Sequence, residues 1–301
     1  MSKSSKNRLR MNVKKYYSWL RLRYPRLRRA VFCRRCRTGG YHVLFATALM
    51  VSLCGCGRVD VDTRLREAAA AASKGYWQLA VEMTEECAAE APNNLTAAVL
   101  HGLCLLEVRQ EDEALDVLSH ATELAPDEFL PHYFYGWALT RTGAYGDALE
   151  PLRRAYELRR AYPDVIPDVL ILLSRCCLEQ RLAKGMGYLQ ALRMYRAYRQ
   201  SPEVYNSLGL LWTYELEYEN ARENFLKALE RAPENAVVLQ NMAVLHDAYL
   251  DEPDSARRYY MYSLKARQVA GDSGRQTKIR RRLRQLARQT RDADTAGGGV
   301  N

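Results

Sequence analysis

Small and apolar residues recur at a fixed interval along the middle of the chain. The interval is 34 residues, and it separates Ala80 from Ala114 and Ala148, Gly102 from Gly136, and Pro92 from Pro126. Between these marks no strand-like alternation of apolar and polar residues and no hairpin signal interrupts the pattern. A fixed period of this length predicts a chain built from repeated helix pairs. The expected fold class is therefore all-α.

The residues within each period resemble the tetratricopeptide repeat (TPR), a helix–turn–helix unit that reads W-x2-L-G-x2-Y, then A-x3-F, then P. The best copy runs Tyr205-x2-Leu208-Gly209-x2-Trp212, followed by Ala221-x3-Phe225, Ala228 and Pro233. Two earlier copies, containing Gly136 with Ala148 and Gly102 with Ala114, share one phase, and looser copies flank these three. The resemblance implies a right-handed solenoid of about five to six helix pairs over residues 61–270, followed by a C-terminal capping helix.

A steric argument explains the pattern. The Gly and Ala positions mark the places where two antiparallel helices cross so closely that only a small side chain fits. The aromatic and Leu positions fill the layer between the helices, and the Pro follows the second helix because it cannot continue the hydrogen-bond ladder. The alternative is a run of generic helices rich in Ala and Leu, and the shared phase of three kinds of residue argues against it.

One copy breaks the phase. Ala148 and Ala221 are 73 residues apart, which is 34 plus 39, so the copy between them carries about five extra residues. We predict its first helix over residues 164–180, opened by Pro163 and Pro167, and its second helix over residues 186–199. Ala191 and Tyr195 then take the Ala-x3-aromatic positions, and residues 182–187 form a longer internal turn.

Charge is distributed unevenly along the 301 residues, whose net charge is +10. Residues 1–37 hold 14 Lys or Arg and no acid, and residues 275–291 hold 8 basic residues and no acid. The body between them, residues 38–274, has 23 basic against 33 acidic residues and a net charge of −10. A duplex nucleic-acid site needs a basic face on the folded body. We therefore do not expect nucleic acid as a partner of the repeats.

An apolar run follows the basic N-terminal stretch. Residues 41–53 read YHVLFATALMVSL and lead into Cys54-Gly55-Cys56-Gly57. A basic region, an apolar run and small residues behind it indicate an export signal, whereas a membrane-spanning helix needs about 20 apolar residues. The exit resembles a bacterial lipobox, with Leu53 three places before Cys56 and Gly55 directly before it. The resemblance implies a lipid on Cys56 and anchoring in the bacterial cell envelope, at the outer membrane where the cell has one; the alternative is an uncleaved signal anchor in the cytoplasmic membrane.

The expected organisation of the chain has five parts: a basic extension (1–40), an export signal or signal anchor (41–56), the solenoid (61–270), a basic capping helix (275–291) and a disordered tail (292–301). Ile279, Leu283 and Leu286 share one face of the last helix, and a solenoid needs such a terminal helix with a polar outer face. A helix that binds nucleic acid or lipid is the alternative. The N-terminal extension is long for an export signal, so translation starts later, for instance at Met11, or the extension is an arm for RNA or an anionic membrane.

No pattern indicates catalysis, a metal site or a cofactor. A Gly-rich phosphate loop, His-Glu-x2-His and Gly-x-Ser-x-Gly are absent from the sequence. Cys33 and Cys36 have half of a zinc-binding spacing and no second pair. Free, buried thiols are predicted in the apolar helical stretches, at Cys87, Cys104, Cys176 and Cys177. Packing positions are predicted for His101, His132 and His246.

Function then depends on the concave groove that the TPR resemblance implies, which the first helix of each repeat lines in this family. The matching positions are Leu103 and Glu107; Tyr133, Trp137 and Arg141; Asn206, Leu210 and Tyr214; and Gln240, Asn241 and Asp247. An aromatic and mixed-polar groove suits a helix or an extended peptide. The alternative for Tyr133 and Trp137 is packing between neighbouring repeats.

Two hypotheses of function follow. The first is a non-enzymatic TPR lipoprotein, anchored through Cys56, that acts as a scaffold in envelope assembly and binds a peptide or helix of a protein partner. It resembles the bacterial TPR lipoproteins that support pilus, envelope or secretion assemblies. The second is a cytoplasmic regulator, associated with a membrane or RNA, whose basic N-terminal arm is functional.

Overall fold

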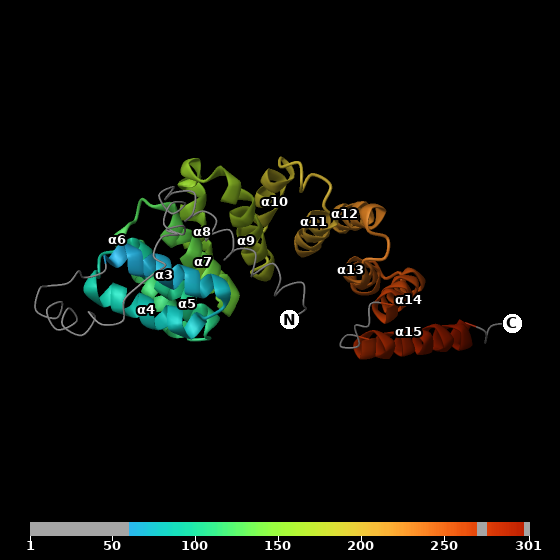
Figure 1. Cartoon of the computed structure of the whole chain (residues 1–301). Helices are drawn as coiled ribbons and strands as arrows, with labels where there is room; N and C mark the ends of the chain where they lie inside the picture. Colours follow the sequence, from blue (N-terminus) through green and yellow to red (C-terminus); the bar gives the residue numbers. More distant parts are fainter. Residues whose placement is uncertain (1–59, 270–275, 298–301) are drawn as a thin grey trace, which may run out of the picture. The chain divides into compact units, whose positions relative to one another are not determined.

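The computed structural model describes residues 60–269 and 276–297. The chain divides into two compact units, the first ending at Pro126 and the second beginning at Asp127. Throughout these residues the regular elements are helices, and each unit consists of antiparallel helix pairs (Figure 1). The first unit contains two pairs, α3 (Val61–Lys74) with α4 (Trp77–Glu90) and α5 (Leu95–Glu107) with α6 (Glu111–Leu124).

The second unit contains four pairs: α7 (Phe129–Thr142) with α8 (Tyr145–Glu157), α9 (Ile166–Glu179) with α10 (Gly185–Arg193), α11 (Pro202–Tyr214) with α12 (Tyr218–Arg231), and α13 (Ala236–Ala248) with α14 (Pro253–Val269). Two short 3-10 turns, η2 (Arg159–Ala161) and η3 (Pro163–Val165), connect α8 with α9, and α15 (Gln276–Gly297) packs on α14. The described residues thus form six helix pairs and one further helix. The predicted all-α solenoid of five to six pairs is confirmed.

The glycines of the period lie where the two helices of a pair touch. A Cβ atom added at Gly209 of α11 would lie 2.6 Å from the ring of Phe225 on α12. At Gly136 of α7 the same atom would lie 2.5 Å from Leu152 of α8. Phe225 and Leu152 are themselves buried, so they have little room to move aside. The steric explanation of the small residues is therefore correct.

Each pair reverses direction through one residue in the left-handed conformation. Glycine occupies this place in two turns, at Gly75 and Gly143 with φ values of 90° and 94°, while Arg109, Arg181, Leu216 and Asp251 occupy it in the others with φ between 52° and 72°. A non-glycine residue in this conformation costs roughly 1–2 kcal/mol. Four of the six turns adopt this conformation without glycine, so the packing of the helix pair must determine the conformation of the turn.

The phase of the irregular pair differs from the prediction. The second helix, predicted over residues 186–199, is α10, which ends at Arg193, so its predicted C-terminal end is wrong and Tyr195 lies outside it. Gly185 takes the place assigned to Ala191, since a Cβ atom on it would lie 2.8 Å from Cβ of Cys177 on α9. Leu189 and Leu192, both buried, then occupy the positions that Phe225 and Ala228 hold in the best copy.

This correction also places the extra residues. Ala148 to Gly185 is 37 residues and Gly185 to Ala221 is 36, so three extra residues fall in the first interval and two in the second. Residues 158–165 separate α8 from α9 and residues 194–201 separate α10 from α11, whereas four residues separate the pairs at 91–94, 125–128 and 232–235. The two connections flanking this pair are therefore longer than the regular ones, and its internal turn, residues 180–184, is also longer than the turn of any other described pair.

The last helix is fixed by one apolar face and one ion pair. Ile279 and Leu286 of α15 are buried against Ala243, Ala256 and Tyr260, and Leu283 packs beside them. The Arg282 guanidinium donates to both carboxylate oxygens of Asp247, at 2.6 and 2.7 Å. Arg280, Arg281 and Arg284 are exposed. α15 thus extends the packing of the last pair and exposes a basic surface.

Several predicted features lie outside the described residues: Cys33, Cys36, the apolar run at 41–53, and the proposed lipid site Cys56. Among the helices that are described, none combines the length and the hydropathy that crossing a membrane requires. The four cysteines at positions 87, 104, 176 and 177 are free and buried, as predicted. Burial raises the pKa of the Cys104 thiol to about 12 and that of Cys177 to about 11.

We predict that Gly209→Ala destabilises the protein, because the added methyl group overlaps the Phe225 ring and overpacking of this kind costs about 1–3 kcal/mol. Gly187→Ala is the matched control, because Gly187 lies in a helix and no atom is within 4 Å of its added methyl group. It should be neutral or stabilising by about 0.5–1 kcal/mol. Urea unfolding followed by circular dichroism measures both effects, and equal midpoints for the two variants would contradict the close-crossing explanation.

Candidate functional site

The candidate groove is best defined on α11 and α13, the first helices of two consecutive pairs. Both begin at a capping residue: Ser201 Oγ accepts a hydrogen bond from the Val204 amide, and Asn235 Oδ1 accepts from the Val238 amide. Such caps satisfy amide groups that have no partner within the helix. They fix where each helix starts, and therefore which residues each helix turns toward its neighbour.

Two predicted groove residues meet across these helices. Asn241 of α13 donates a hydrogen bond from Nδ2 to Oδ1 of Asn206 on α11, at 2.8 Å. Both side chains remain partly exposed. A carboxamide has two N–H donors and an oxygen that accepts twice. This pair therefore retains the amide donors of Asn206 and the oxygen of Asn241 for a ligand.

Aromatic and apolar side chains flank the asparagine pair. Leu210 and Tyr214 follow Asn206 at intervals of four residues along α11, so they share one face of it, and both are partly exposed. The Tyr214 ring lies 5.3 Å from the Arg181 guanidinium. Directly before Asn206 on α11, Tyr205 Oη accepts a hydrogen bond from Arg193 at 3.2 Å. The predicted residues of α11 thus form a continuous, mixed-polar surface.

The C-terminal residues of the predicted groove are already engaged. Gln240 accepts a hydrogen bond from the Arg267 guanidinium at 2.8 Å. Asp247 accepts from Arg282 of α15 and from the Tyr260 hydroxyl, and burial raises the pKa of Tyr260. These two residues serve packing between helices, so the asparagine pair and α11 supply the available surface.

Three predicted groove residues are buried instead. Tyr133 is 4% exposed, Trp137 2% and Leu103 2%. Tyr133 stacks on Phe129, with ring centroids 5.6 Å apart, and Phe129 stacks in turn on Tyr162 at 4.8 Å. Burial raises the pKa of the Tyr133 hydroxyl accordingly. We therefore assign the two α7 aromatic residues to packing, the alternative that the sequence left open.

Leu103 is buried for a simpler reason. Every residue from Ala97 to Leu106 of α5 is buried, and a helix that is apolar all round packs on all sides. Glu107 and Arg141, at the C-terminal ends of α5 and α7, are half-buried, and the Arg141 guanidinium lies 5.5 Å from the centroid of the Trp137 ring. Neither α5 nor α7 offers the open polar surface of α11.

The histidines occupy packing positions, as predicted. His101 is buried, its Nδ1 lies 2.9 Å from Thr84 Oγ1, and burial lowers its pKa. His132 is half-buried. His246 is 5% exposed and stacks on Tyr259, with ring centroids 5.2 Å apart. Within the described part of the chain, His, Cys, Asp and Glu side chains form no group of three that could hold a metal ion.

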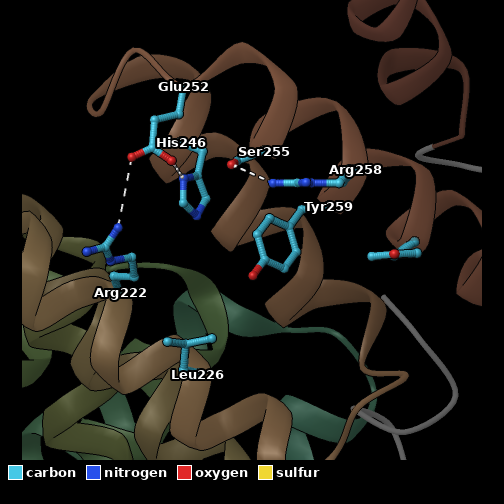
Figure 2. Close-up of a pocket in the computed structure, with 8 residues that line it drawn as sticks. Arg222, Leu226, His246, Glu252, Ser255, Arg258 and Tyr259 are labelled. Carbon is cyan, nitrogen blue, oxygen red and sulfur yellow. Dashed lines mark hydrogen bonds and ion pairs between the residues drawn. The ribbon is translucent and has the colours of Figure 1, made fainter.

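A second surface was not predicted from the sequence. It is an open pocket of about 620 Å³ between α12 and α14, shown in Figure 2 and lined by Arg222, Leu226, His246, Glu252, Ser255, Arg258, Tyr259 and Tyr262. None of these residues belongs to the predicted groove. The pocket brings together residues up to 40 positions apart on three helices and one turn, and no local motif marks such a set.

Solved structures with similar folds include TPR proteins. PilW, a type IV pilus biogenesis factor, is 16% identical with a TM-score of 0.56, covering 74% of this chain and 99% of PilW. PilF of Pseudomonas aeruginosa is 16% identical with a TM-score of 0.53, covering 74% and 97%. YrrB, a TPR protein with an unusual peptide-binding site, is 17% identical with a TM-score of 0.50, covering 62% and 94%.

This chain has the tetratricopeptide-repeat fold. At these identities the likeness concerns the fold alone. The sequence matches no protein-family model and no curated protein. A partner and a location in the cell are therefore proposed from the residues of this chain itself.

We predict that Trp137→Ala lowers the stability of the TPR array by about 3–5 kcal/mol, because truncating a buried aromatic side chain leaves a cavity. Tyr214→Ala is the matched control, an aromatic residue near the end of another first helix that remains partly exposed. Its effect should be below about 1 kcal/mol. Urea unfolding compares the two, and an unchanged midpoint for Trp137→Ala would show that its side chain is available to a partner.

Proposed function

We propose that this TPR protein is a non-catalytic scaffold that binds an extended segment of a partner protein along α11 and α13. The observation that supports it most directly is the hydrogen bond between Asn206 and Asn241. The pair retains donors on one side chain and an acceptor on the other. An extended peptide presents an N–H and a C=O from each residue that is not proline. The asparagine pair can therefore bind a main chain without regard to its side chains.

Specificity would come from the neighbouring side chains of α11. Leu210 and Tyr214 provide apolar and aromatic contact area beside the asparagine pair. Aromatic residues at the centre of an interface frequently carry much of its binding energy. A peptide with an apolar side chain close to its point of main-chain contact is thus the ligand that this surface fits.

We further propose that the scaffold is anchored through a lipid on Cys56 and acts in envelope assembly. The support is the order of a basic region, an apolar run and Leu53-Cys54-Gly55-Cys56. Helix α3 begins at Val61, five residues after Cys56. At about 3.4 Å per extended residue, a lipid there would hold the first repeat within about 17 Å of the membrane. PilW, with its similar fold, is a pilus biogenesis factor, and that role is compatible with the proposed location.

We predict that p-benzoylphenylalanine in place of Tyr214 forms a photo-crosslink to a partner protein in the native cell. Asn206→Ala combined with Asn241→Ala should abolish the adduct, because the main-chain contacts disappear. The array should stay folded, since a neutral hydrogen bond contributes only about 1 kcal/mol to stability. Immunoblotting measures the adduct and circular dichroism checks the fold.

The matched control places the same photo-reactive residue at Met194, which is 76% exposed and lies outside α11 and α13. An adduct of the same size and yield from Met194 would reflect proximity without binding in the groove. An adduct from position 214 that persists in the double asparagine variant would contradict the proposed main-chain contact.

We predict that metabolic labelling with a palmitate analogue marks the protein and that Cys56→Ala removes the label. Cys54→Ala, two residues away, should keep it, because Leu53, Gly55 and Cys56 are unchanged. Loss of label in Cys54→Ala alone would assign the lipid to the other cysteine. A full-length, unlabelled protein would exclude the lipoprotein proposal: recovery in the membrane would then indicate a signal anchor, and recovery in solution the cytoplasmic alternative.

A further inference from the structure

The pocket between α12 and α14 contains a cation without an acidic partner. The exposed guanidinium of Arg258 donates to Ser255 Oγ at 3.1 Å, and among the described residues it forms no ion pair. Arg222, across the pocket, instead pairs with Glu219 at 2.5 Å and lies 3.9 Å from Glu252. Figure 2 shows the two arginines on opposite sides of the pocket. Arg258 is therefore the group available to an anionic ligand.

A buried histidine offers a second polar contact. Nδ1 of His246 lies 2.9 Å from a carboxylate oxygen of Glu252, and this hydrogen bond lowers the pKa of Glu252. An ionised carboxylate only accepts, so Nδ1 carries the proton and donates. In the neutral ring Nε2 is then an acceptor. Figure 2 shows this second nitrogen directed away from Glu252, on the side of the pocket where Leu226 lies.

Two apolar side chains complete the pocket. Leu226 of α12 is 43% exposed and Tyr262 of α14 is 56% exposed, and both line it. The Tyr259 ring, which stacks on His246, also lines the pocket. The pocket therefore contains a cation, an acceptor for an N–H or O–H group and an apolar surface.

We propose that this pocket is a second peptide-binding site, which takes a segment carrying an acidic residue beside an apolar one. The ligand carboxylate pairs with Arg258, a main-chain or side-chain N–H donates to Nε2 of His246, and the apolar side chain rests on Leu226 and Tyr262. The phosphate backbone of a nucleic acid would pair with the arginine but would leave the apolar side chains and the histidine acceptor without a contact. The site is separate from the asparagine pair and does not depend on it.

The test uses the full-length protein, immobilised in detergent, and a phage-displayed library of random short peptides. Selected sequences should share Asp or Glu next to Leu, Phe or Trp. A synthetic copy of the most enriched peptide is then titrated by fluorescence anisotropy. Arg258→Glu should weaken its binding at least about tenfold, which corresponds to the loss of one charge-assisted contact. Tyr262→Ser should weaken it about fivefold, because apolar contact is lost.

Matched controls lie next to each substituted residue. Arg257 and Met261 are exposed on α14, and neither lines the pocket. Arg257→Glu and Met261→Ser should change the affinity by less than about twofold. A peptide whose acidic residue is replaced by Lys should bind Arg258→Glu better than it binds the unmodified protein. The variant Asn206→Ala with Asn241→Ala should bind the original peptide normally, which separates this site from the groove.

Three outcomes would overturn the proposal. The first is a selection that enriches no peptide, or enriches peptides without an acidic residue. The second is equal weakening by Arg257→Glu and Arg258→Glu, which would indicate attraction to overall charge. The third is binding of a polyuridine oligonucleotide that is lost in Arg258→Glu and competes with the peptide, which would make the pocket a nucleic-acid site.

Discussion

The close approach of two helices at a single glycine or alanine is the constraint on which the structure depends. The contact of Gly209 with Phe225 determines how closely α11 and α12 approach each other. A turn of three residues connects the two helices. Leu216, 68% exposed, adopts the left-handed conformation in that turn although its side chain gains little there. The cost of this strain is offset by the layer that the helix pair buries.

The same constraint influences which repeats present polar surface. Once the crossing point has fixed the buried face, the remaining residues of each first helix determine what surface the repeat presents. In α5 they are almost all apolar and buried, and in α7 the aromatic residues Tyr133 and Trp137 are buried. In α11 and α13 they include two asparagines, which form a hydrogen bond of 2.8 Å with each other. One fold therefore contains repeats that only pack and repeats that present a surface.

The sequence predicted the elements better than the surfaces because the period records contacts within one helix pair. Gly209 and Ala221 belong to the same pair, so their spacing could be read directly. The irregular pair was misassigned because Ala191 fits the motif letters, whereas the crossing uses Gly185, the smaller residue. Tyr133 was placed in the groove because its position on the helix is predictable, whereas its burial beside Phe129, on which Tyr162 also stacks, is not. The pocket was not predicted because its residues lie on α12 and α14, which belong to different helix pairs and come together only when the pairs stack.

A scaffold binds more than one partner, and α13 presents residues of two proposed sites on different faces. Asn241 and His246 are five residues apart on this helix, which is about 7.5 Å along its axis and about 140° around it. Asn241 faces α11, whereas His246 faces the pocket between α12 and α14. The groove offers neutral carboxamides and the pocket offers an exposed arginine, so added salt should weaken only the contact with the pocket. Two ligands of different chemistry could then occupy the two sides of one rigid helix without competing for a residue.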